Sequence, residues 1–182
     1  MLRHQLQQTI DVARYQGIPL VVSLQAQYSL VDRHIDYEVM AVCRDYEIPI
    51  LAWSPLGGGW LTGKYQRDSL PTGQTRLGED PTRGMEAYDK RNHERTYRIL
   101  EAVAHVSGEM GVSMAEVALS WLLQAPEIGS VILGARSVPQ LEQNLSAGRV
   151  PLSTQVWEEL WEVSNPELPH YPYGFLDTMG GR

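Results

Sequence analysis

The residues best suited to chemistry lie in one stretch, Trp53-Ser54-Pro55-Leu56-Gly57-Gly58-Gly59, with Lys64 shortly after it. Glycines adopt positive φ easily and let backbone N–H groups come close to a phosphate. An indole, a hydroxyl and an ammonium group beside such a turn would suit a flat, charged cofactor. The alternative is a buried strand followed by an ordinary turn, because glycine-rich turns are common. The rest of the sequence distinguishes the two.

Composition restricts the class of partner. The 182 residues carry a net charge of −7 and contain no Lys/Arg cluster, which disfavours nucleic acids and anionic membranes as partners. No apolar run is long enough to span a membrane, and the N-terminal residues lack the apolar core of a signal peptide, so we expect a cytoplasmic protein. Cys43 is the single cysteine and the five histidines are scattered, so neither a disulfide nor a metal site is expected.

Helices and strands alternate on the N-terminal side of the glycine-rich stretch. Apolar residues at helical spacing predict a helix from near Met1 to Gly17, and a short apolar run predicts a strand at 20–25. A second helix at 36–46 precedes a strand at 48–53, whose continuous apolar run predicts burial on both faces. This alternation indicates a parallel α/β sheet.

On the C-terminal side, residues 66–92 are polar and have no apolar period, which predicts a long loop that is functional or mobile. Beyond it the pattern predicts, in order, helices at 94–110 and after Ser113, a strand at 130–135, and helices capped by Ser137 and Ser153. A sheet of three parallel strands would have two bare edges, which proteins normally cover. We therefore expect part of a larger sheet, able to self-associate through its open edges.

Three separated motifs together resemble the aldo-keto reductase family. Residues 23–33, SLQAQYSLVDR, are similar to the sixth strand of that family and the turn after it. Residues 52–65, AWSPLGGGWLTGKY, resemble the end of the seventh strand. Residues 131–137, VILGARS, with the later pairs Gln140-Leu141 and Asn144-Leu145, resemble the eighth strand and its helix. The style is nearest to bacterial and plant members that group with the potassium-channel β-subunits.

The resemblance implies the C-terminal part of a TIM-type (β/α)8 barrel, strands six to eight with their helices, incomplete in this chain. Residues 1–165 would form the partial barrel and residues 166–182 a C-terminal tail. The family binds NADPH across the carboxyl ends of the strands, where such barrels generally build active sites. Its reaction is the reduction of an aldehyde or ketone to an alcohol. The implied ligands are therefore NADP(H) and a small carbonyl substrate.

The resemblance also implies cofactor contacts. Gln25 would hydrogen-bond the nicotinamide carboxamide, and Trp53 would stack on the nicotinamide ring. Arg136 would clamp a ribose 2′-phosphate and so favour NADP over NAD. The other implied contacts are Ser54, Pro55, Leu56, Gly57 and Gly58 to the pyrophosphate, Lys64 and Arg76 as cationic cover, and Gly134, Gln140, Gln143 and Asn144 toward the adenosine. The family often has an acidic residue where Gln143 stands.

The catalytic groups of the family are a tyrosine acting as general acid, a lysine, an aspartate and often a histidine, all from the first half of the barrel. This chain starts with the helix after strand five, so we expect none of those positions here. The tyrosines at hand belong to other elements, and we expect none to serve as the acid: Tyr15, Tyr28, Tyr37 and Tyr97. The chain alone is expected to be inactive as a reductase.

Three interpretations stay open at this point. The chain is a C-terminal fragment of an NADP(H)-dependent reductase, or a non-catalytic half-barrel module that binds NADP or a partner, or a remnant that does not fold alone. Substrate identity cannot be read, because the family sets it mainly with loops of the first half and with the tail. The aromatic residues of that tail are Tyr171, Tyr173 and Phe175.

Overall fold

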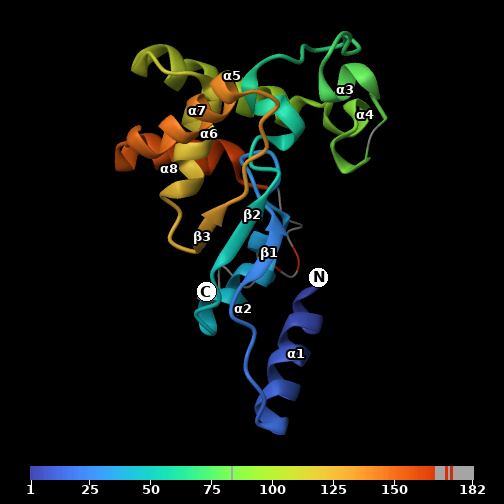
Figure 1. Ribbon diagram of the computed structural model, residues 1–182, viewed down its shortest axis with the longest axis vertical. Coiled ribbons are helices and arrows are strands. Elements are labelled where there is room, and N and C mark those ends of the chain that lie inside the picture. Colours follow the sequence, from blue (N-terminus) through green and yellow to red (C-terminus); the bar gives the residue numbers. More distant parts are fainter. Residues whose placement is uncertain (83, 167–170, 172, 174–182) are drawn as a thin grey trace.

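The computed structural model describes residues 1–82, 84–166, 171 and 173, so most of the expected tail, including Phe175, lies outside the described residues. The described chain contains one sheet of three parallel strands in the order β1-β2-β3, where β1 is Leu24–Gln27, β2 is Ile50–Trp53 and β3 is Ile128–Val131. Helix α1 (Arg3–Gln16) lies at one end of an elongated molecule, and most other helices gather toward the carboxyl ends of the strands (Figure 1). The prediction of a parallel α/β sheet is confirmed.

The remaining elements follow in chain order. The α-helices are α2 (Val39–Asp45), α3 (Arg76–Glu79), α4 (Tyr88–Arg91), α5 (Glu94–Met110), α6 (Met114–Leu123), α7 (Val138–Ser146) and α8 (Thr154–Ser164). Short 3₁₀ turns are η1 (His34–Tyr37), η2 (Gly57–Thr62), η3 (Gly84–Glu86) and η4 (Ala147–Arg149).

Helix ends agree with the caps expected from the sequence. Gly17 ends α1 in the left-handed conformation that glycine adopts without strain. The Ser113 hydroxyl accepts from the Glu116 N–H, and the Glu116 carboxylate accepts from the Ser113 N–H, which forms a capping box at α6. The hydroxyls of Ser137 and Ser153 cap α7 and α8 by accepting from the N–H groups of Gln140 and Val156.

The two faces of the sheet differ in burial. Ile50 and Ala52 of β2 are fully buried, whereas Leu51 and Trp53 on the opposite face are only half-buried. Register places Gln25 beside Leu51 and Gln27 beside Trp53, so these side chains share that second face. The prediction that β2 is buried on both faces was therefore wrong. Only one face of the sheet packs against the apolar core of the described residues.

Two strands begin and end elsewhere than predicted. Leu20 and Val22 are apolar but 42% and 82% exposed, and β1 starts only at Leu24, whose N–H donates to the Pro49 carbonyl at 3.0 Å. The third strand begins two residues and ends four residues earlier than predicted, because β3 spans Ile128–Val131 and the chain then leaves the sheet toward α7. Hydrogen bonding to β2 decides these bounds, and a local apolar run does not report it.

The segment 66–92 contains short helical elements, α3, η3 and α4, and is not the featureless loop that was predicted. Single apolar residues anchor it: Leu77 is fully buried, and the Tyr88 ring stacks on Trp60 at 5.5 Å between ring centroids. Because each turn contributes only one such anchor, the segment has no apolar period for sequence analysis to detect.

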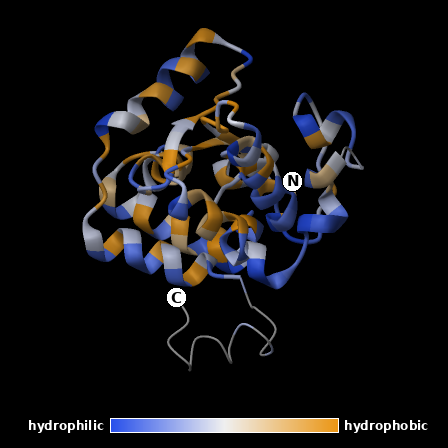
Figure 2. Cartoon of the chain, turned by 90° about the horizontal axis from the view of Figure 1, so that it is seen from below, coloured by the Kyte–Doolittle hydropathy of each residue, from blue (hydrophilic) through white to orange (hydrophobic). Residues whose placement is uncertain are grey.

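Apolar residues from α5, α6 and α8 form the main core beside the sheet. In Figure 2 hydrophobic residues, in orange, gather toward the inside of the molecule. Arg33 lies within this core with its guanidinium over the Trp161 ring, 3.8 Å from its centroid, and donates to the Ser164 hydroxyl at 2.7 Å. Other apolar side chains remain exposed at the two sides of the sheet. They are Leu2, Val12, Ile18, Leu20 and Val22 near β1, and Ile132, Val138, Leu141 and Leu145 near β3.

Candidate cofactor-binding site

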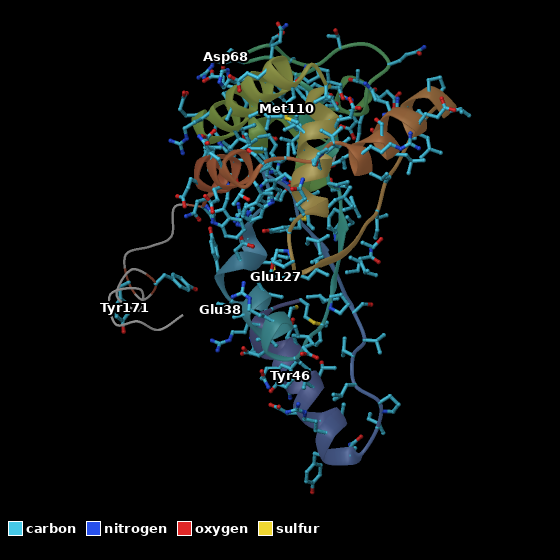
Figure 3. All side chains as sticks on the ribbon, turned by 90° about the vertical axis from the view of Figure 1, so that its left-hand side faces the viewer. Glu38, Tyr46, Asp68, Met110, Glu127 and Tyr171 are labelled. Carbon is cyan, nitrogen blue, oxygen red and sulfur yellow. The ribbon has the colours of Figure 1, made fainter. Side chains whose placement is uncertain are left out.

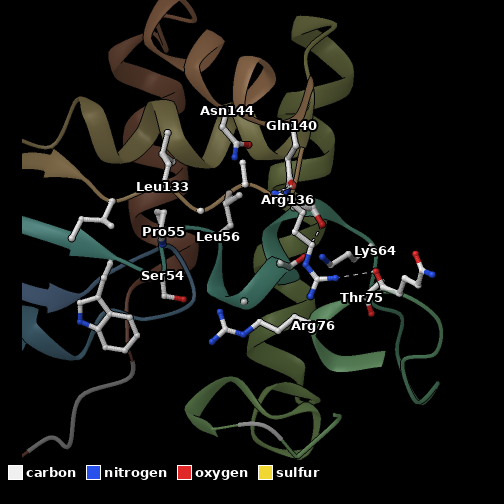
Figure 4. A pocket seen from close by; sticks show the side chains of 18 residues that line it. Ser54, Pro55, Leu56, Lys64, Thr75, Arg76, Leu133, Arg136, Gln140 and Asn144 are labelled. Atoms are coloured by element: carbon white, nitrogen blue, oxygen red, sulfur yellow. Dashed lines mark hydrogen bonds between the residues drawn. The ribbon is translucent and has the colours of Figure 1, made fainter. Parts of the chain in front are cut away.

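A pocket of about 640 Å³ opens at the carboxyl ends of β2 and β3, where parallel α/β folds generally bind ligands. Figure 4 shows side chains from η2, α3, α7 and the segment after β3 facing this space. The residues that line it are Trp53, Ser54, Pro55, Leu56, Gly58, Gly59, Thr62, Lys64, Gln74, Thr75, Arg76, Ile132, Leu133, Gly134, Ala135, Arg136, Gln140 and Asn144. Most of the side chains singled out from the sequence are therefore brought together.

Two polar atoms in this pocket lack a partner in the described chain. The Ser54 hydroxyl oxygen and the Asn144 amide nitrogen are buried without a hydrogen bond to other described residues. Ser54 also has φ 55°, a left-handed conformation that is uncommon outside glycine. Leaving a buried polar group unpaired costs about 1–3 kcal/mol, so such atoms usually have a ligand or water as partner. Both atoms fit a polar ligand in the pocket.

The glycines after Leu56 have conformations and surroundings that other residues would not tolerate. Gly57, Gly58 and Gly59 have φ of 56°, 68° and 100°. A Cβ at Gly58 would lie 2.5 Å from the Glu86 carboxylate, and one at Gly59 would lie 2.5 Å from the Lys64 side chain. Because these positions carry no side chains, the backbone of the turn is accessible from the pocket, which suits close approach of a phosphate.

Cationic side chains reach the pocket from three elements. Lys64 follows η2, Arg76 begins α3 and Arg136 follows β3 (Figure 4). The Arg76 guanidinium lies 3.3 Å from the carboxylate of the buried Glu86 and remains half-exposed. The Arg136 guanidinium donates to both Glu79 carboxylate oxygens, at 3.1 and 3.3 Å, and to the Gln74 carbonyl. The surroundings of the pocket thus favour an anionic ligand.

Three of the residues expected at the cofactor lie outside the lining. Gln25 is exposed on the less buried face of β1, two residues before Gln27, which pairs with Trp53. Gly57 is buried, and a Cβ at this position would lie 2.6 Å from Val31 Cγ2. Gln143 on α7 is exposed and is absent from the lining, although it is three residues from Gln140.

One further segment, Gln74 and Thr75, lines the pocket although no predicted motif includes it. Gln74 and Thr75 reach it because α3 folds back, with the Thr75 hydroxyl accepting from the Gly78 N–H at 2.9 Å as an N-cap. Thr-x-x-Gly is a weak signal that could have marked this turn. The other missed residues flank predicted ones and could have been included by adjacency: Gly59, Thr62, Ile132, Leu133 and Ala135.

The sequence model of the Aldo/keto reductase family matches residues 4–165. The chain belongs to the aldo-keto reductase family. A soybean protein described as probable aldo-keto reductase 1 is 30% identical over 171 residues, which is 94% of this chain and 45% of the soybean protein.

Other similar aldo-keto reductases include a rice protein described as a probable voltage-gated potassium channel subunit beta, 31% identical over 71% of this chain and 39% of its own length. Aldo-keto reductase yakc [NADP(+)] of Schizosaccharomyces pombe is 29% identical over 92% of this chain and 51% of its own length. The chain thus spans about half the length of the curated relatives it matches.

The four tyrosines singled out from the sequence of this aldo-keto reductase differ in burial. Burial raises the pKa of Tyr28, which is fully buried in the core, and also raises the pKa of Tyr97 and Tyr37. A tyrosine that donates a proton near neutral pH needs a lowered pKa. Tyr15 is 91% exposed on α1.

The described residues contain no cluster of three or more His, Cys, Asp or Glu that could hold a metal ion. Within the same residues, no helix combines the length and apolarity needed to cross a membrane.

Proposed function

We propose that this chain is the NADP(H)-binding part of an aldo-keto reductase barrel, comprising strands six to eight, and that it does not reduce carbonyl compounds by itself. The observation that carries the proposal is the pocket beside the glycine-rich turn, where two unpaired polar atoms and three cationic side chains surround about 640 Å³. Its position at the carboxyl ends of parallel strands supports the same assignment.

Each residue has a physical role in holding the cofactor. The half-buried Trp53 indole offers a flat face for the nicotinamide at the end of β2. Ser54, Pro55, Leu56 and the glycine turn would hold the pyrophosphate, with Lys64 and Arg76 neutralising its charge. Gly134, Gln140 and Asn144 would bind the adenosine half, and Arg136 the 2′-phosphate. The exposed Gln25 and Gln143 would be the outermost contacts.

The reaction of the complete barrel would be reduction of an aldehyde or ketone to an alcohol. NADPH supplies a hydride when bound. The described residues of this chain would fix the ring face, hold the phosphates and keep the pocket polar. A carbonyl oxygen also has to receive a proton as charge develops on it. With the pKa of Tyr28, Tyr37 and Tyr97 raised, we infer that the proton comes from outside this chain.

The experiment is to measure NADPH binding to the purified chain by calorimetry and by quenching of tryptophan fluorescence. Loss of the stacking face in Trp53→Ala should weaken binding roughly three- to tenfold. Trp157→Phe is the matched control, because Trp157 stacks on Trp161 at 5.2 Å in the core and does not line the pocket. Equal affinities of wild type and Trp53→Ala, or no binding by the folded chain, would contradict the proposal.

A second candidate function is that of a non-catalytic half-barrel that assembles with a partner. The observation in its favour is the exposed apolar surface at both sides of the sheet, Val22 and Ile18 near β1 and Val138, Leu141 and Leu145 on α7. Residues i, i+3 and i+7 on a helix form one stripe, so the three α7 side chains are continuous. Such a stripe is typical of a contact surface.

Sedimentation velocity tests whether the chain self-associates. A half-barrel that self-associates should sediment as a dimer or larger, and the double variant Leu141→Gln/Leu145→Gln should shift it toward the monomer. Glu142→Gln on the same helix is the control for a change that leaves the stripe intact. A wild-type chain that stays monomeric at all concentrations would reject self-association and leave NADP(H) binding as the assigned function.

A further inference from the structure

A second cavity, of about 430 Å³, lies apart from the nucleotide pocket and shares no lining residue with it. It is lined by Val31, Asp32, His34, Tyr37, Met85, Lys90, Arg91, His93, Arg95 and Pro166. These residues come from the turn after β1, from α4 and the start of α5, and from the residues after α8. Nothing in the proposed function uses this cavity.

We propose that this cavity binds a small organic anion, through a carboxylate or phosphate group held by Lys90, Arg91 and Arg95. The size of the cavity is within the range of pockets that hold small molecules, about 300–1,000 Å³. Val31, Met85 and Pro166 give it an apolar wall, which suits the carbon skeleton of such a ligand.

Charge is the first argument. The lining contains Lys90, Arg91 and Arg95, and Asp32 is its single carboxylate, in a protein whose net charge is −7. Asp32 is already engaged, because its carboxylate pairs with Arg91 and accepts from the Gln27 amide at 3.2 Å. Two carboxylates close by also have partners, since Glu86 pairs with Arg76 and Glu94 with Arg67. A surplus of positive charge therefore remains in the cavity.

The second argument is that a buried cation in this cavity has an unused donor. Arg91 is 7% exposed, donates from Nη1 to the Val31 carbonyl at 3.0 Å and contacts Asp32 through Nη2. Its Nε, and the Nε of Arg95, are buried with no hydrogen-bond partner among the described residues. Arg95 is otherwise fixed, because it donates to the carbonyls of Val31 and Ser164. Both guanidinium groups are thus pre-positioned with donor capacity left.

The third argument is the helix that starts at the cavity. His93 is the N-cap residue of α5, a helix of 17 residues, and lines the cavity with Arg95 in the first turn. The N-terminal end of a helix carries partial positive charge and attracts anions. Burial lowers the pKa of the His93 imidazole, and the positive charges of Arg95 and Arg91 lower this pKa further. An anion in the cavity would relieve this repulsion.

The test uses histidine ring signals in NMR spectra of the full chain at constant pH. Inorganic phosphate and malonate are titrated separately, which distinguishes a phosphate site from a carboxylate site. We expect the signals of His34 and His93 to shift and saturate, while those of His4 on α1 and His105 on the exposed side of α5 stay in place. Uniform shifts of all four, or no saturable shift with either anion, would overturn the proposal.

Variants separate a specific site from general attraction. Lys90 is exposed and makes one hydrogen bond, to the Gly84 carbonyl, so Lys90→Gln should fold normally and weaken anion binding about fivefold. Lys90→Arg should retain binding. Arg3→Gln removes the same charge from α1 and should have no effect. Arg136→Gln in the nucleotide pocket should also leave the His93 shift unchanged, and loss of the shift there would mean that the ion occupies the nucleotide pocket.

Discussion

Arg136, which lines the pocket at the carboxyl ends of β2 and β3, forms an ion pair with Glu79. Two guanidinium nitrogens of Arg136, which follows β3, donate to the two carboxylate oxygens of Glu79 at the end of α3, at 3.1 and 3.3 Å. The ion pair connects the end of α3 to the segment between β3 and α7. Figure 1 shows α3 at the end of the molecule opposite α1. Both side chains are about half-exposed, 57% and 50%, so the ion pair adds little stability and can open.

The first prediction concerns this ion pair. If Arg136 binds the 2′-phosphate, Glu79 competes with it for the same donors, and Glu79→Gln should tighten NADP⁺ binding roughly two- to fivefold. Arg136→Met should weaken NADP⁺ by about tenfold or more and leave NAD⁺ nearly unchanged, because a charge-assisted pair to phosphate is lost. Calorimetry with both nucleotides measures this. Equal losses for NADP⁺ and NAD⁺ would rule out the 2′-phosphate role.

The second prediction concerns the glycine turn. Gly57 has φ 56°, and a Cβ there would lie 2.6 Å from Val31 Cγ2, so Gly57→Ala combines backbone strain with overpacking. We expect the free energy of unfolding to fall by about 2–4 kcal/mol in urea denaturation. Gly108→Ala is the control, because Gly108 lies inside α5 with no atom within 4 Å of its Cβ position. That variant should gain roughly 0.5–1 kcal/mol.

Local signals in the sequence predicted the helices well and the strands less well. Gly17 and the pair Ser113 and Glu116 act on their own helix ends, so their residue types suffice. Strand bounds depend on a partner. The polar Gln27 belongs to β1 because it pairs with Trp53, whereas the apolar Val22 finds no such pairing and is exposed.

In the candidate site, likewise, the shared location of a contiguous motif could be predicted, whereas a contact between distant segments could not. The run from Trp53 to Gly58 is contiguous, so its shared location follows from the sequence motif. Glu79 could not be assigned to Arg136 in advance, because their contact depends on how the segment after Lys64 folds back on single anchors such as Leu77. Asp68 of this long segment is exposed, at the end of the molecule far from Tyr46 (Figure 3).

The third prediction uses Glu86, which is 3% exposed beside Gly58 and Arg76. Burial raises the pKa of this carboxyl above its ordinary value of 4.5, and Arg76 offsets only part of the effect. The folded state therefore holds the proton more tightly than the unfolded chain. The contribution of Glu86 to stability is full below pH 4.5 and is lost as pH rises through the raised pKa.

Glu86→Gln should accordingly gain stability relative to wild type as pH rises from 4.5 toward 7 in urea denaturation. Glu116→Gln is the opposite control. Hydrogen bonds from Ser113 and Ser146 lower the pKa of Glu116, so its contribution is present above its ordinary pKa and is lost as pH falls through the lowered one. That variant should lose about 1 kcal/mol at neutral pH. The same slope for both variants would exclude the assignment.

The last prediction concerns Ser54, where binding and stability should move in opposite directions. Its hydroxyl is buried without a partner in the described chain, so Ser54→Ala should leave the free energy of unfolding unchanged or raise it by up to about 1–2 kcal/mol. The same variant should bind NADP⁺ about tenfold more weakly, because the ligand loses a buried hydrogen bond. Ser54→Gly also relieves the φ of 55° and should be at least as stable as the alanine variant. Urea denaturation and calorimetry on the same samples test both halves, and weaker folding with unchanged NADP⁺ affinity would make Ser54 a purely structural residue.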